Sequence, residues 1–146
     1  MTVAAPKWTP PAPGDIPAPH LPETHKDIHT QANTTDFAPR HIHLDWLVDW
    51  KEHRLQGRVT HTINITKEGT ELVTLDTSFL DVRQAGLVDE KGKERKVSFD
   101  MGKRNGTIGS ALTIHIGPHA KGEEVKIAID YSTTEQCTAL GWLNAQ

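Results

Sequence analysis

The sequence predicts an all-β domain, an antiparallel β-sandwich or a saddle-like twisted sheet of about seven to eight strands. From Arg40 onward, apolar residues alternate with polar ones, as is typical of strands with one buried face. Polar turns that contain glycine separate these alternating segments. No window has the i, i+3, i+4, i+7 apolar spacing of an amphipathic helix.

A change in composition near residue 39 divides the chain into two parts. Eight of the nine prolines lie at or before Pro39, whereas ten of the eleven glycines follow residue 40. Prolines lack a backbone donor, and the first part has little apolar surface to offset its ordering entropy. We therefore expect residues 1–38 to form a flexible, Pro-rich leader, in which Trp8 or the stretch DIHTQANTTDF touches the body. A polyproline docking motif is the less favoured interpretation.

The first hairpin of the body is expected in HIHLDWLVDW and LQGRVTHTINI, joined by a turn at KEHR. One face of its first strand is apolar and is predicted to be buried: Ile42, Leu44, Trp46, Val48 and Trp50. The opposite face is polar and is predicted to meet solvent: His41, His43, Asp45 and Asp49. On the second strand, four apolar residues share one side: Leu55, Val59, Ile63 and Ile65.

The middle of the body is expected to hold strands in ELVTLDT and FLDVRQAGLV, then a tight turn at DEKGKER and a return strand at KVSF. The stretch MGKRNGTIGS is predicted to be a loop. A second hairpin follows, with its turn at GPHAKG. Its alternating apolar residues are Leu112, Ile114, Ile116, Val125, Ile127, Ile129 and Tyr131.

Composition excludes several functional classes. The net charge of −3 and the lack of a Lys or Arg run argue against a nucleic-acid partner. A membrane partner is not expected either, because the chain has no long apolar span and no apolar signal segment, so we expect a cytoplasmic protein. Cys137 is the single cysteine, which excludes an internal disulfide and a multi-thiolate zinc site.

No residue pattern predicts an active site. His41 and His43 share the spacing of metal ligands on a strand, but a solvent-facing stripe explains them better and no third ligand is evident. The loop at residues 102–109 lacks the Gly-Lys-Ser/Thr ending and the helix of a phosphate-binding loop. Neither Cys137 nor any serine has the neighbours of an activated nucleophile. We predict no catalytic, cofactor-binding or metal-binding residue in this chain.

Four short phrases occur in order, at residues 41–44 (HIHL), 55–57 (LQG), 75–77 (LDT) and 139–143 (ALGWL). With them, residues 39–146 resemble the N-terminal β-domain of leukotriene A4 hydrolase and the related fungal aminopeptidases, which are zinc aminopeptidases of the gluzincin type. In that family the phrase at 139–143 lies inside the N-terminal domain. Further strands and a separate catalytic domain with a His-Glu-x-x-His zinc motif follow it.

The resemblance implies a non-catalytic scaffold domain, because this chain contains no His-Glu-x-x-His motif. We expect an incomplete N-terminal domain, truncated before the catalytic domain that would be its partner in cis. Zinc, peptide substrates and a possible epoxide hydrolase activity would belong to the parent enzyme. Trp142 and Leu143 should then be under-buried, and the sheet should have an unprotected edge.

The alternative is a stand-alone β-sandwich module that binds peptide or carbohydrate. Such a module would use exposed aromatic residues, namely Trp46 or Trp50, or would add a strand at its edge. Filling of the core is the favoured interpretation of both tryptophans.

Overall fold

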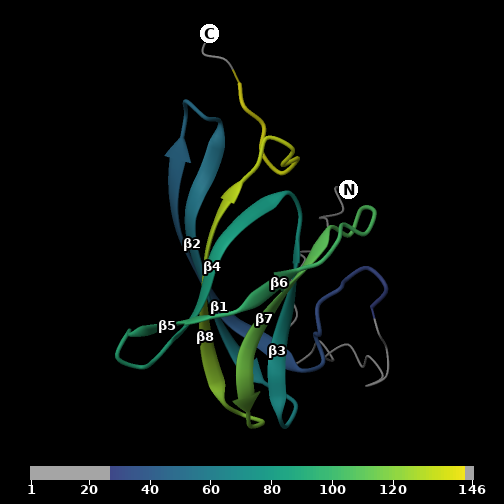
Figure 1. Ribbon diagram of the computed structural model, residues 1–146, viewed down its shortest axis with the longest axis vertical. Helices are drawn as coiled ribbons and strands as arrows, with labels where there is room; N and C mark the ends of the chain where they lie inside the picture. The colour runs from purple at the N-terminus through teal and green to yellow at the C-terminus, as the bar shows by residue number, and fades with distance from the viewer. Residues whose placement is uncertain (1–26, 144–146) are drawn as a thin grey trace, which may run out of the picture.

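The computed structural model describes residues 27–143, and within them the chain forms eight β-strands and no helix (Figure 1). The strands are β1 (Phe37–Asp49), β2 (Arg54–Ile65), β3 (Thr70–Thr77), β4 (Leu80–Val88), β5 (Glu94–Val97), β6 (Phe99–Met101), β7 (Ser110–His119) and β8 (Glu124–Thr133). All their pairings are antiparallel. The predicted all-β class is confirmed.

The strands make two sheets. Sheet A has five strands in the order β1-β2-β8-β4-β5, and sheet B has three in the order β3-β7-β6. Figure 1 shows sheet B beside the lower half of the molecule, while the hairpin of β1 and β2 extends past it toward the C-terminal end. Sheet B therefore covers only part of the inner face of sheet A, the face that is turned toward it.

The hydrophobic core lies between the two sheets. Its side chains come from alternate positions on the central strands, as the period-two pattern predicts. The largest fully buried ones are Ile63, Ile65, Val73, Leu112, Ile114, Ile116 and Ile127. The predicted apolar face of the last hairpin is confirmed, because every one of its seven apolar residues is buried.

The burial predicted for the apolar face of β1 is wrong. The exposed fractions are 51% for Ile42, 47% for Leu44, 44% for Trp46 and 38% for Val48, and Trp50 in the following turn reaches 75%. The reason is the position of the strand: β1 is the edge strand of sheet A, beyond the reach of sheet B. Alternation identified the apolar face correctly. It could not show that this face has no covering element among residues 27–143.

Neither Trp46 nor Trp50 fills the core, so that interpretation is also wrong. Trp46 instead packs at the margin of the core, where its Nε1 donates a hydrogen bond of 2.8 Å to the hydroxyl of Tyr131. The two rings meet edge to face, with centroids 6.5 Å apart. Gly57 lies opposite Trp46 in the register of β1 and β2. A Cβ atom at Gly57 would overlap the carbonyl oxygen of Asp45, so glycine allows the two strands to approach.

The predicted return strand KVSF is divided between the two sheets. β5 ends at Val97 in sheet A, and β6 begins at Phe99 in sheet B. Ser98 makes the crossing, and its carbonyl oxygen accepts a hydrogen bond of 3.0 Å from the backbone N–H of His115. Period-two alternation continues through such a crossing, so the sequence does not reveal it. The predicted turn GPHAKG is also shorter, because β7 continues to His119.

The segment before β1 lies against β3. Thr30 and the backbone N–H of Gln31 donate hydrogen bonds to the carboxylate of Asp76. The side chain of Asn33 bonds to the backbone of β3 on both sides, accepting from Thr74 N–H at 2.8 Å and donating to the Leu72 carbonyl at 2.9 Å. DIHTQANTTDF therefore touches the body, whereas Trp8 lies outside the described residues.

Candidate functional site

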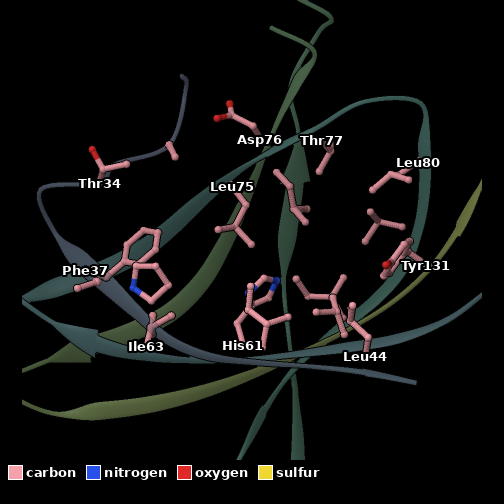
Figure 2. Close-up of a pocket in the computed structure, with 18 residues that line it drawn as sticks. Thr34, Phe37, Leu44, His61, Ile63, Leu75, Asp76, Thr77, Leu80 and Tyr131 are labelled. Carbon is pink, nitrogen blue, oxygen red and sulfur yellow. The ribbon is translucent and has the colours of Figure 1, made fainter. Parts of the chain in front are cut away.

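An apolar hollow of about 680 Å³ lies between the two sheets (Figure 2). Its floor is the inner face of sheet A, and β3 with part of β7 forms the opposite wall. Ile42 and Leu44 of β1 lie along one margin, where the apolar face of that strand is exposed. The hollow is thus continuous with the uncovered face of β1.

Hydrocarbon side chains make up most of the lining. In Figure 2, Phe37, Ile63 and His61 lie close together, and Leu75 faces them from the opposite wall. Leu80 and Tyr131 lie at the other end. Two hydroxyl groups on the lining are engaged within the protein: the Thr77 hydroxyl donates to the Ser110 carbonyl at 2.8 Å, and the Tyr131 hydroxyl accepts from Trp46. The site therefore suits an apolar occupant.

The segment before β1 forms the rim on the side of β3. Ala32 and Thr34 line the hollow directly, and Asp76 holds the segment in place through Thr30 and Gln31. Asp36 follows on the same segment. Burial alone would raise its pKa, but hydrogen bonds from Asn33 and Thr35 and the charge of Lys67 outweigh that effect, so the pKa of Asp36 is lowered. This rim is the part of the site that composition had assigned to a flexible leader.

Two titratable groups of the lining have shifted pKa values. Burial lowers the pKa of His61, which favours the neutral imidazole. Burial also raises the pKa of the Tyr131 phenol, and the hydrogen bond from Trp46 opposes this rise in part. Both shifts favour the uncharged form of these two side chains. The Asp76 carboxylate at the rim accepts hydrogen bonds from Thr30 and Gln31.

The strongest polar cluster lies on the opposite, outer face of sheet A. Arg58 makes a bidentate pair with Asp130, at 2.7 Å from Nε and 2.8 Å from Nη2, and a third bond of 2.8 Å with Glu94. Gln84 donates to the other oxygen of Glu94 at 2.9 Å. The bonds from Arg58 hold the pKa of Asp130 below its ordinary value, and Asp130 and Glu94 together raise the pKa of Arg58. The cluster joins β2, β8, β4 and β5 and is a structural network.

The residues weighed as candidates from the sequence are scattered. His41 and His43 are exposed on the polar face of β1, and Cys137 is half-buried in the segment after β8. The loop at 102–109 connects two strands of sheet B, with a backbone bridge between Asn105 and Gly109. Within residues 27–143, no three His, Cys, Asp or Glu side chains meet in a group that could hold a metal ion. The same residues include no helix that could span a membrane.

Sequence reasoning missed the hollow itself. The alternating pattern places seven of its lining residues on apolar faces: Ile42, Leu44, Val59, Ile63, Leu112, Ile129 and Tyr131. The missing cover over β1 depends instead on how far sheet B extends. The rim segment that contains Thr30, Gln31 and Asn33 is rich in polar, turn-forming residues, and this composition indicates an ordered turn. That composition does not identify Asp76 as the residue that accepts hydrogen bonds from Thr30 and Gln31.

The comparison with known families agrees with this geometry. The Peptidase M1 N-terminal domain matches residues 25–142, most of the chain. The chain belongs to this family. The hollow and the exposed face of β1 therefore belong to an M1 N-terminal domain, a type of domain that also occurs in much longer proteins.

Known relatives of this M1 N-terminal domain are fungal enzymes. Leucine aminopeptidase 2 of Yarrowia lipolytica is 36% identical over 134 residues, a match that covers 92% of this chain and 19% of the relative. The Leukotriene A-4 hydrolase homolog of Botryotinia fuckeliana is 35% identical over 120 residues, which cover 81% of this chain and 18% of the relative. This chain thus spans about a fifth of the length of these proteins.

Solved structures give the same result. The structure of yeast LTA4 hydrolase in complex with Bestatin matches with a TM-score of 0.71 and 30% identity, over 87% of this chain and 19% of the enzyme. Native leukotriene A4 hydrolase from Saccharomyces cerevisiae matches with a TM-score of 0.66 and 28% identity. This region is the non-catalytic N-terminal part of M1 enzymes, as the resemblance of the four sequence phrases implied.

Proposed function

We propose that this M1 N-terminal domain is the scaffold of a zinc metallo-aminopeptidase or of a leukotriene A4 hydrolase-like epoxide hydrolase. Its role is to support a catalytic domain in cis and to contribute to the wall of the cleft for peptide substrates. The observation that carries this proposal is the apolar hollow, which is open beside the exposed side chains of Ile42 and Leu44. An apolar surface of this kind is typical of a protein contact.

The chemistry of the site supports a scaffold over a catalyst. Burial favours the neutral forms of His61 and Tyr131, and the hydroxyl groups of Thr77 and Tyr131 are engaged in bonds within the protein. The described residues also do not fit the zinc ion of the parent family, because they bring no three ligands together. Under this proposal zinc is held by the catalytic domain, and no step of hydrolysis takes place on the residues described.

A chimera tests the proposal. Residues 25–142 would replace the matching N-terminal region of leucine aminopeptidase 2 from Yarrowia lipolytica, and hydrolysis of leucine p-nitroanilide would be measured. We expect the chimera to retain zinc-dependent activity, whereas the 146-residue chain alone shows none. Turnover by the chain alone, or a soluble chimera that binds zinc but is inactive, would contradict the proposal.

A matched pair of variants assigns the effect to the apolar face. Ile42→Asp with Leu44→Asp places charges at the margin of the hollow and should abolish activity or assembly of the chimera. His41→Asp with His43→Asp places the same charges on the opposite face of the same strand and should leave the chimera active. Equal effects of the two pairs would show that the hollow is not the contact.

One observation favours the alternative of a binding module. Trp142 stacks on His53 at 5.2 Å and meets Trp50 edge to face at 5.7 Å, beside the turn between β1 and β2. Three aromatic rings at the surface could hold a sugar ring or an aromatic side chain. Titration of tryptophan fluorescence with oligosaccharides and peptides would distinguish the two functions, since the scaffold proposal expects no saturable change.

A further inference from the structure

The outer edge of β1 is open among the described residues. Within sheet A, β1 pairs with β2 on one side only. Its one irregularity lies between Pro39 and His41, and from His41 to Asp49 its register with β2 is continuous. Edge strands are normally blunted by prolines, lysines or bulges, and residues 41–49 contain none of these. The segment is therefore competent to pair with another strand.

The apolar face of β1 adds a reason for such pairing. Ile42, Leu44 and Trp46 are each about half exposed, and all three project from the same side of the strand. A strand added at the edge would bring its own side chains beside these three. Aromatic and aliphatic pairs across neighbouring strands stabilise a sheet, so the best occupant is itself an alternating apolar strand.

The polar face of β1 selects the occupant by charge. Its first half carries His41 and His43, and its second half carries Asp45, the exposed Leu47 and Asp49. Asp49 is ion-paired with Arg54 of its own chain. An antiparallel copy of the same strand reverses this order and so brings histidines opposite aspartates. A parallel copy in register would place each aspartate beside another aspartate, and like charges directly opposite destabilise a sheet.

Charge also distinguishes between two neighbouring registers. If the two-fold axis passed beside Asp45, the two Asp45 carboxylates would face each other. If it passes beside Leu44, His43 of each copy lies opposite Asp45 of the other, and Ile42 lies opposite Trp46. Neither His43 nor Asp45 has a side-chain hydrogen bond or ion pair to the described residues of its own chain, so both are available.

We propose that two copies of this chain associate through their β1 strands, antiparallel and about a two-fold axis beside Leu44. The two five-stranded sheets then join into one, and the His43 and Asp45 side chains form two equivalent cross-strand pairs. Such a contact is isologous, since each strand provides the same surface to the other. This inference goes beyond the proposed scaffold function and concerns the chain by itself.

The first test is the mass of the full 146-residue chain in solution, measured by light scattering during size exclusion at about 50 µM. We expect twice the chain mass of 16.2 kDa. His43→Asp places carboxylates opposite Asp45 and should weaken the dimer at least tenfold. His43→Asp with Asp45→His restores complementary pairs and should restore the dimer. A monomeric wild type, or a His43→Asp dimer of equal affinity, would overturn the proposal.

Crosslinking tests the register independently of affinity. In a Cys137→Ser background, Leu44→Cys places two thiols opposite each other at a separation that suits a disulfide. Mild oxidation should then give a covalent dimer. Leu47→Cys is the matched control, because position 47 lies opposite position 41 and its thiols remain apart. Crosslinking at 47 but not at 44 would contradict the register.

The Pro-rich residues 1–24 are the competing partner for the edge of β1 within the same chain, and their deletion tests this alternative. Residues 1–26 contain seven prolines, which lack a backbone N–H. This stretch can therefore donate few of the backbone hydrogen bonds that pairing with β1 requires. We expect the deletion to leave the dimer unchanged. A dimer that appears only after the deletion would assign the edge to the leader instead. Activity of the chimera is a separate readout, so failure here leaves the scaffold function standing.

Discussion

At the scale of single residues, His61 shows how a polar residue is accommodated in an apolar site. It belongs to the alternating face of β2 with Val59 and Ile63, so its side chain points into the hollow together with theirs. Burial lowers its pKa, and the neutral ring behaves as a flat, weakly polar group. The sequence identifies the face, but the pKa depends on how closely the opposite wall approaches.

Replacing His61 with leucine should remove a source of acid sensitivity. Below the ordinary histidine pKa, the unfolded chain takes up a proton at His61, whereas the folded chain resists it because the folded pKa is lower. Stability therefore falls as the pH decreases from about 7 to about 5, by at most about 1.4 kcal/mol per pH unit for one proton. Urea unfolding at both pH values should show a smaller loss for His61→Leu than for the wild type. His41→Gln is the control, because His41 is exposed, and an equal loss in all three proteins would contradict the assignment to His61.

At the scale of elements, Arg58 links strands that the sequence could not show to be neighbours. The sequence predicted β2 and β8 as members of two separate hairpins, yet they pair along nine residues in sheet A. Arg58 on β2 reaches Asp130 on β8 and Glu94 on β5. Because Arg58 is 40% exposed, its ion pairs lie in a strongly solvated environment.

The coupling between Arg58 and Asp130 should depend on pH. The pKa of Asp130 is lowered in the folded state, so its contribution is present above the ordinary aspartate pKa and is lost as the pH falls through the folded value. A double-mutant cycle with Arg58→Met and Asp130→Asn should give a coupling of about 1 kcal/mol at pH 7. The coupling should decline at the lowest pH at which all four proteins still fold. A coupling that does not change with pH would indicate packing of the arginine stem instead of charge.

The same scale explains which strands could be predicted. Alternation and turn chemistry located all the main strands, because both signals are local in the sequence. The burial of β1 and the crossing at Ser98 were not predictable, since each depends on which strand lies at an edge and how far the other sheet extends. Of the two residues expected to be under-buried, Leu143 is 96% exposed, whereas Trp142 is half-buried because it packs on His53 and Trp50.

At the scale of the whole molecule, the two sheets are joined in three ways. Their inner faces share one core, and the chain passes between them at Ser98. The segment before β1 also ties the start of sheet A to β3 of sheet B. The apolar side chains of sheet B are buried in the core that it shares with sheet A, so the stability of sheet B depends on sheet A.

The two sheets should consequently unfold in a single transition. Trp46 lies on β1, and Trp50 and Trp142 lie beside the turn that follows it, so these tryptophans report on sheet A. Ile114 is fully buried in sheet B. Ile114→Val should destabilise the protein by about 1 kcal/mol. Its unfolding curves by tryptophan fluorescence and by far-ultraviolet circular dichroism should shift together, because loss of packing in sheet B removes support from sheet A.

Leu72→Ala is the control: Leu72 is 41% exposed on β3, so a smaller shift is expected. A circular dichroism curve that divides into two steps while the fluorescence midpoint stays at the wild-type value would show that the sheets fold independently.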